Sequence, residues 1–176
     1  QIEVASGNYS TDITYPDSGL AQKLKTVAQL IDSGLQTRIY YVTLDGFDTH
    51  SRQAPVHAAL LKELSSALDS FVRDLGEHGH GNRVLTMAFS EFGRRLKENA
   101  SEGTDHGAAA PVFLAGQGVK PGLHGKQPAV YDLDDGDVKF HTDFRQVYAT
   151  VLDGWLRVAS ASILGDTYAP VPALKS

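Results

Sequence analysis

The feature that most constrains the fold is a long amphipathic stretch flanked by two short apolar runs. Residues 38–44 read RIYYVTL, an aromatic and β-branched run that is typical of a buried strand. Apolar side chains then recur at helical spacing over 56–75, with Pro55 predicted at the first helical position. A second apolar run, RVLTMAF, covers 83–89. This order predicts a strand, a long helix and a second strand, as in an α/β sheet.

The N-terminal part is predicted to contain an irregular arm followed by a helix. Residues 1–18 are rich in Ser, Thr, Asp and Gly, a composition that is typical of loops. Apolar residues at helical spacing predict a helix over 20–31, and Gly34 stands where such a helix would end.

The C-terminal part is predicted to add a third strand and a last helix. The run PVFLA at 111–115 is short and apolar, and the spacing of apolar side chains over 144–155 is helical. Either Thr142 or Asp143 would cap this helix. Apolar strands separated by helices predict a three-layer α/β/α sandwich, in which ligands bind at the carboxyl ends of the strands.

Composition excludes several classes of protein. The 176 residues fit one domain, and no apolar run approaches the ~20 residues that cross a bilayer. A formal net charge of -5 argues against a broad basic surface for nucleic acid. The chain has no Cys, so any metal would be held by carboxylate and imidazole ligands. Because the sequence starts at Gln1 without a signal peptide, we expect part of a longer protein or a mature domain after cleavage.

Three short segments place Asp and His near the predicted ends of strands or helices. LDGFDTH follows the first strand at 44–50, and GTDHG at 103–107 is predicted to be a Gly-rich loop. FHTD at 140–143 begins the last helix. Carboxylate and neutral imidazole suit zinc, manganese or another divalent ion, and a hydrolytic two-metal site needs several of them. One such segment alone is more often structural, but the three together predict a metal site.

The stretch SEFGRR offers two supporting residues. Glu91 would orient a ligating His, and Arg94 would hold an anionic substrate with its planar guanidinium. An ordinary surface turn stabilised by ion pairs is an equally good interpretation of this stretch. The acidic run at 132–137 lacks the Glu that closes an EF-hand loop, so it predicts a solvated hairpin turn. The remaining histidines are interpreted as structural; they are His57, His78, His80 and His124.

Four motifs together resemble domain-of-unknown-function family 1501. They are LDGFDTHSRQ, FSEFGRR followed by Asn99, GTDHGAAAPVFLAGQGVKPG and FHTDFRQVYATVLDGWL, in the order of that family. The family looks like a branch of the alkaline phosphatase and sulfatase superfamily. The resemblance therefore implies that residues 19–176 are the C-terminal part of an alkaline phosphatase-like α/β domain.

The resemblance also implies a set of metal ligands. Asp48, His50 and His141 would hold one divalent ion, zinc or manganese, and Asp105 and His106 would hold a second. Asp45 is an alternative to Asp48, because the superfamily usually separates this Asp and His by four positions and neither Asp fits that spacing. The two-metal site is expected only in the full-length protein.

By resemblance, the chain is the C-terminal metal-binding portion of a hydrolase of phosphate or sulfate esters, exported to the periplasm or secreted. Its substrate would be a small anionic ester, and the oligomeric state is left open. The catalytic nucleophile is expected to be absent from this chain, because the early hydroxyls do not follow a strand; they are Ser6, Ser10, Thr11 and Thr14. The alternative is a non-catalytic binding or structural module on the same fold. A weaker third interpretation is a mutase or phosphotransfer enzyme.

Overall fold

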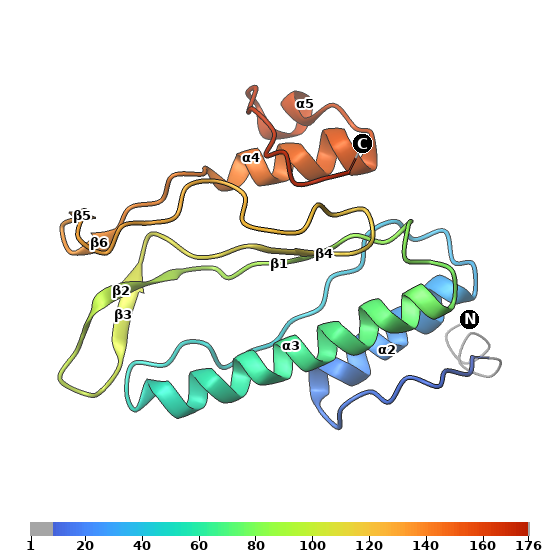
Figure 1. Cartoon of the computed structure of the whole chain (residues 1–176), viewed down its shortest axis with the longest axis horizontal. Coiled ribbons are helices and arrows are strands. Elements are labelled where there is room, and N and C mark those ends of the chain that lie inside the picture. The colour runs from blue at the N-terminus through green and yellow to red at the C-terminus, as the bar shows by residue number, and fades with distance from the viewer. Residues whose placement is uncertain (1–8, 176) are drawn as a thin grey trace. The chain divides into compact units, whose positions relative to one another are not determined.

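The computed structural model describes residues 9–175, which divide into two compact units (Figure 1). The first unit comprises residues 9–84 and 99–103, and the second comprises 85–98 and 104–175. Residues 1–8 of the predicted N-terminal arm lie outside the described residues. The helices and strands are α2 (Gly19–Asp32), α3 (Gln53–Glu77), β1 (Thr86–Ala88), β2 (Gly93–Glu98), β3 (Thr104–Gly107), β4 (Phe113–Ala115), β5 (Leu133–Asp134), β6 (Asp137–Val138), α4 (Phe144–Ala149), the π-helix η1 (Thr150–Leu156) and α5 (Ser160–Leu164).

Helix α2 confirms the helix predicted over 20–31. The Ser18 hydroxyl caps its start by accepting a hydrogen bond from the backbone N–H of Ala21. Gly34 follows the end of the helix with φ of 78°, the left-handed conformation in which glycine carries no Cβ penalty. The local pattern therefore predicted both the helix and its end.

The hydrophobic core of the first unit forms between α2 and α3. The apolar faces of both helices contribute to it, and the segment before α2 covers part of it. Its buried members are Ile13, Tyr15, Leu20, Ala21, Leu24, Val27, Ala28, Ile31, Ala67, Phe71 and Leu75. Burial of these side chains is the main stabilising term available to this unit.

Helix α3 confirms the predicted long helix but begins two residues earlier than Pro55. Pro55 lies in the first turn, where backbone N–H groups have no partner within the helix. Two of these groups are satisfied from a distant segment: the N–H groups of Arg52 and Gln53 donate to the carbonyls of Ser101 and Glu102, each at 2.9 Å. The segment 99–103 therefore takes the place of a side-chain cap.

The predicted strand at 38–44 does not form a ladder within residues 9–175. Its side chains alternate, with Tyr40, Val42 and Leu44 against the core, while Ile39 is 71% and Tyr41 76% exposed. The alternation is that of a strand with one buried face. The prediction of a buried strand is wrong for the described residues, because no described strand of this unit pairs with the segment and one of its faces is exposed.

The second unit contains three two-stranded antiparallel sheets. β1 pairs with β4, which confirms the predicted strands at 83–89 and 111–115 in shorter form. β5 pairs with β6 through Asp135 and Gly136, whose φ angles of 47° and 80° suit the tight hairpin turn predicted at 132–137. The described chain is thus a mixed α/β structure with small sheets.

The hairpin of β2 and β3 was not predicted. The segment GTDHG, predicted as a loop, supplies β3 and pairs with β2. Gly107 of this segment and Gly93 of β2 both lie very close to another backbone. A Cβ on Gly107 would lie 2.6 Å from the carbonyl carbon of Arg94, and a Cβ on Gly93 would lie 1.8 Å from the carbonyl oxygen of Ala109. Glycine is normally interpreted as a turn residue, but here it lets two backbones pack closely.

The predicted C-terminal helix is present, with a change of helix type. Asp143 is its N-cap: its carboxylate accepts from the N–H of Arg145, and Gln146 completes a capping box. After Ala149 the helix continues as η1. Within residues 9–175, none of the helices combines the length and the apolar character that crossing a membrane requires.

Candidate metal centre

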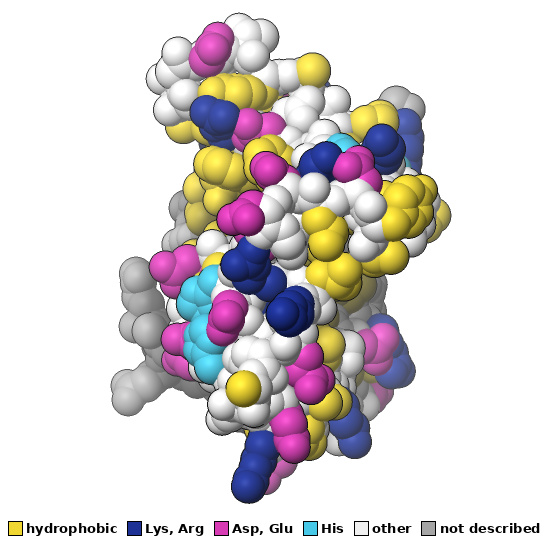
Figure 2. Space-filling model, turned by 90° about the vertical axis from the view of Figure 1, so that its left-hand side faces the viewer, with side chains coloured by type: hydrophobic (Ala, Val, Ile, Leu, Met, Phe, Trp, Pro, Cys, Tyr) yellow, Lys and Arg dark blue, Asp and Glu magenta, His cyan; other side chains and the backbone are white. Residues whose placement is uncertain are grey.

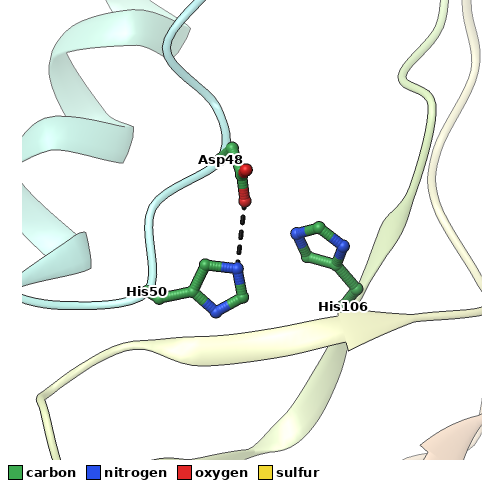
Figure 3. A group of neighbouring side chains, drawn as sticks. All are labelled: Asp48, His50 and His106. Carbon is green, nitrogen blue, oxygen red and sulfur yellow. Dashed lines mark ion pairs between the residues drawn. The ribbon is translucent and has the colours of Figure 1, made fainter.

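Asp48 and His50 form an ion pair in the loop before α3. The distance between Asp48 Oδ1 and His50 Nε2 is 3.0 Å, and Figure 3 shows the two side chains pointing toward each other. Both are exposed, and acidic and histidine side chains are visible on the surface drawn in Figure 2. Carboxylate oxygen and imidazole nitrogen are the kinds of atoms that divalent ions take as ligands in proteins.

The segment 99–103 fixes the backbone of this loop. The Asn99 side-chain amide donates to the carbonyl of His50 at 3.0 Å, and its oxygen accepts from the N–H groups of Ser101 and Gly103. A Cβ on Gly103 would lie 2.4 Å from the carbonyl of His50, so only glycine fits there. Asn99 was part of a recognised motif, but the sequence did not reveal that it positions His50.

Asp45 lies in the same loop and is exposed. The structure pairs His50 with Asp48, and Gly46, with φ of 98°, turns the backbone between the two acidic residues. Phe47 packs edge-on against the His57 ring, with ring centroids 5.6 Å apart. The geometry of the loop therefore favours Asp48 as the partner of His50 and gives His57 a packing role.

Asp105 and His106 lie on β3 in the second unit, and both are exposed. The predicted loop would have let both side chains face one ion, but successive side chains of a regular strand point to opposite faces. The His106 ring stacks on Phe92, with centroids 3.7 Å apart and planes inclined by 10°. Figure 3 draws this His106 side chain on its strand. The orientation of the imidazole is thus tied to an aromatic neighbour.

Arg94 and Glu91, the two supporting residues of the predicted site, lie on either side of Phe92. The Arg94 guanidinium donates to the carbonyl of Thr104 and lies 5.2 Å from the centroid of the Phe92 ring. Glu91 is exposed, and no hydrogen bond from it to a histidine is present among the described residues. The contacts of Arg94 are therefore with the hairpin itself.

His141 is exposed and lies just before the N-cap of α4. It is close enough to the Asp132–Lys139 ion pair to add to its electrostatics: Lys139 mainly, and His141 weakly, hold the pKa of Asp132 below its usual range. Within the described part of the second unit, His141 does not come together with Asp105 and His106 at coordination distance.

One cluster of titratable groups was missed from the sequence. Asp74 on α3 is fully buried and accepts hydrogen bonds from the hydroxyls of Tyr9, Thr11 and Tyr15. Burial and the neighbouring carboxylate raise the pKa of both tyrosines. An Asp at a position facing the apolar stripe of a predicted helix was the available indication, but its three donors lie more than fifty residues earlier in the chain.

His78 completes this cluster at the end of α3. Its Nδ1 lies 2.9 Å from the Asp74 carbonyl and its Nε2 lies 3.0 Å from the Ser10 carbonyl. Its ring also stacks on Tyr9. The hydrogen bond to the Asp74 carbonyl raises the pKa of His78, opposed by partial burial. These hydrogen bonds attach residues 9–15 to the end of α3. We call the cluster of Asp74, His78 and the residues bonded to them the clasp, and we interpret it as structural.

Comparison with known proteins gives a family without an assigned activity. No curated protein and no solved structure matches this sequence. Residues 17–162 match the model of a family described as a protein of unknown function, DUF1501. Because that match covers most of the chain, the protein belongs to the DUF1501 family.

Proposed function

We propose that this chain supplies metal ligands to a metal-dependent hydrolase of small phosphate or sulfate esters. The observation that carries the proposal is the Asp48–His50 pair on a loop that Asn99 and Gly103 hold in place. A fixed carboxylate–imidazole pair reduces the ordering that a bound ion would otherwise require of the loop. The hydrogen bond from Asn99 and the close approach of Gly103 fix the backbone at His50 before any ion binds.

The second pair of ligands comes from the GTDHG segment. Asp105 and His106 are adjacent in the sequence, and the resemblance to the alkaline phosphatase and sulfatase superfamily is what supports assigning them as ligands of a second ion.

The proposed ligand set consists of carboxylates and imidazoles, which suit zinc or manganese. Its members are Asp48, His50, Asp105, His106 and His141. When bound, such ions polarise an ester oxygen and lower the pKa of a coordinated nucleophile. The residues of this chain bind and orient: Asp48 and His50 would bind an ion, and Asn99 holds the loop that carries both.

The proposal includes an alkaline phosphatase-like, three-layer α/β/α arrangement. Segment 38–44, α3 and β1 follow one another in the order of a strand–helix–strand unit. One face of segment 38–44 packs on the helices, and its other face exposes Ile39 and Tyr41. In a three-layer sandwich, a second layer of helices would cover that other face.

We assign no nucleophile among the described hydroxyls. The Thr11 hydroxyl donates a hydrogen bond to the buried Asp74 carboxylate, so Thr11 belongs to the clasp of the first unit. Ser10 lies beside it, and its carbonyl accepts from His78. Ser6 lies outside the described residues.

Isothermal titration of the chain with zinc and with manganese tests the metal-binding part. We expect binding that weakens at least about ten-fold in His50→Ala and in His106→Ala, because each substitution removes a ligand. The matched control is His124→Ala, which removes an exposed imidazole bonded only to its own loop carbonyl at Lys120. Absence of binding by both the unaltered chain and the full-length protein would contradict the proposal, as would equal losses in the control.

Turnover by the natural full-length protein separates the two functional alternatives. Hydrolysis of an aryl phosphate or aryl sulfate that depends on added zinc or manganese supports the hydrolase. Metal binding without turnover of either ester supports a non-catalytic binding module on the same fold. Release of a transferred phosphoryl product, instead of the free anion, would indicate a mutase or phosphotransfer enzyme.

A further inference from the structure

We propose that Phe92 is a positioning residue that fixes the imidazole of His106 for metal binding. The inference rests on the proposed function, because it concerns one of the ligands assigned there. It extends that function by naming a residue that is neither a ligand nor a hydrogen-bonding partner of one.

The contact between the two rings is a parallel stack. Their centroids are 3.7 Å apart and their planes are inclined by 10°, so the rings overlap closely. Phe92 is half-buried, whereas His106 is exposed. The partly buried ring therefore acts as a platform, and the exposed imidazole lies on it with one face covered.

The register of the hairpin places these rings together. Gly93 pairs with Gly107, and Arg94 pairs with His106. Phe92 then lies diagonally across from His106 on the same face of the ladder, within reach of an aromatic side chain. The two glycines keep this register, because a Cβ on either would meet the opposite backbone at less than 3 Å.

Arg94 ties Phe92 to the strand that carries the ligand. Its guanidinium lies 5.2 Å from the centroid of the Phe92 ring and donates to the carbonyl of Thr104, two residues before His106. A cation over an aromatic face is attracted to it. Phe92, which directly precedes β2, is therefore in contact with a side chain that is itself bonded to β3.

Stacking on Phe92 restricts rotation of the His106 imidazole. A free His side chain must be ordered when it binds an ion, and that loss of entropy opposes binding. Ligating imidazoles are usually oriented by a hydrogen bond to their second nitrogen, and loss of such a partner costs metal affinity. Phe92 supplies the same orientation by covering the ring face, because the lone pair of the unprotonated nitrogen lies in the ring plane and is not covered by the stack.

The first experiment compares zinc affinity by isothermal titration in four forms of the full chain. We expect Phe92→Leu to weaken binding roughly ten-fold, the lower end of the range for residues that orient a ligand. Phe92→Tyr keeps the aromatic ring and should bind as the unaltered chain does. Phe113→Leu is the matched control, because it removes a half-exposed ring of β4 in the same unit. Equal affinity in Phe92→Leu and the unaltered chain would overturn the inference.

The second experiment reads the stack without metal. Ring protons of His106, assigned by their absence in His106→Gln, should be displaced upfield by the ring current of Phe92. The displacement should vanish in Phe92→Leu and persist in Phe92→Tyr and Phe113→Leu. If it is absent from the unaltered chain, the stack does not exist in solution and the inference fails.

The two experiments separate failure of the inference from failure of the proposed function. Zinc binding that is unchanged in Phe92→Leu overturns only the role of Phe92 and leaves the metal site standing. Absence of zinc binding by both the unaltered chain and the full-length protein overturns the metal site and, with it, the positioning role, even where the ring-current shift demonstrates the stack. Circular dichroism of each variant identifies a loss of affinity that arises from unfolding. If Phe92→Leu unfolds, the ring-current shift of His106 in the unaltered chain and in Phe92→Tyr decides the inference.

Discussion

The two units of the molecule are built in different ways. The first has a continuous apolar core between α2 and α3, formed by large aliphatic and aromatic side chains. In the described part of the second, Ala149 and Ala173 are the buried apolar side chains, while most of the exposed large hydrophobic side chains belong to this unit. The first unit is therefore stabilised by burial, and the second by backbone pairing, close glycine contacts and ring stacks.

This difference bears on how each unit presents its candidate ligands. Asp48 and His50 lie in a loop of the first unit, and Asn99 and Gly103 of the same unit contact the backbone of this loop at His50. Asp105 and His106 lie on the β2–β3 hairpin, where the His106 ring stacks on Phe92.

The largest expected effect tests the contrast in burial. Phe71 is 3% exposed in the first core, so Phe71→Ala should lower the free energy of unfolding by about 3–5 kcal/mol. Phe113→Ala makes the same change at a side chain that is 51% exposed, and should cost about 1 kcal/mol or less. Urea unfolding followed by amide signals of α3 and of β4 reports each unit separately. Equal losses would show that the second unit has a core of its own.

A smaller effect is expected at the buried clasp. Asp74→Asn removes the charge that accepts from three hydroxyls, and should cost the first unit about 2–3 kcal/mol. The matched control is Asp69→Asn on the same helix, whose ion pair with Arg73 is exposed and should contribute about 0.5 kcal/mol or less. The same urea experiment measures both. If the two substitutions cost the same, the clasp does not hold the N-terminal segment.

The smallest effect is a pH dependence confined to the first unit. Both ring nitrogens of His78 face carbonyl oxygens, and only the protonated imidazole can donate to both. Asp74 and Asp32 also face this ring, and with the carbonyls they raise the pKa of His78 above that of an unfolded histidine, about 6.5.

The sign of the effect follows from this direction. Because the pKa of His78 is higher in the folded state than in the unfolded state, protonation of His78 raises the free energy of unfolding. This contribution is fully present below about pH 6.5 and is lost as the pH rises through the pKa of the folded state. Unfolding measured from pH 5.5 to 8.5 should therefore show the first unit weakening with rising pH. His78→Gln should flatten this slope, whereas His124→Gln, in the second unit, should leave it in place. A slope that survives in His78→Gln would assign it to another group.

Helices and their caps could be predicted because their determinants are local. The apolar spacing of α2, the glycine after it and the Asp143 cap of α4 all lie within a few residues of the feature that they specify. The Asp135–Gly136 hairpin was predicted for the same reason. The sequence also indicated Asp48, His50, Asp105, His106 and His141 as chemically suitable ligands, which is a statement about residue type.

Strand pairing, and the contacts that hold the candidate ligands in place, could not be predicted. The run at 38–44 has every local property of a strand, but a ladder depends on a second segment. The glycines of the β2–β3 hairpin suggested a turn, because close backbone approach is invisible until the partner strand is known. Asp74 was overlooked because its donors come from the segment before α2.

By itself the sequence determined where the helices run and which side chains offer carboxylate and imidazole. Only the tertiary structure decided which of them are held: Asn99 fixes the loop of His50 from 49 residues away, and Phe92 covers His106 across a hairpin. The physical reason is that propensities and caps act within a turn or two of chain. Orientation of a ligand is set by contacts between distant segments, whose meeting no local pattern encodes.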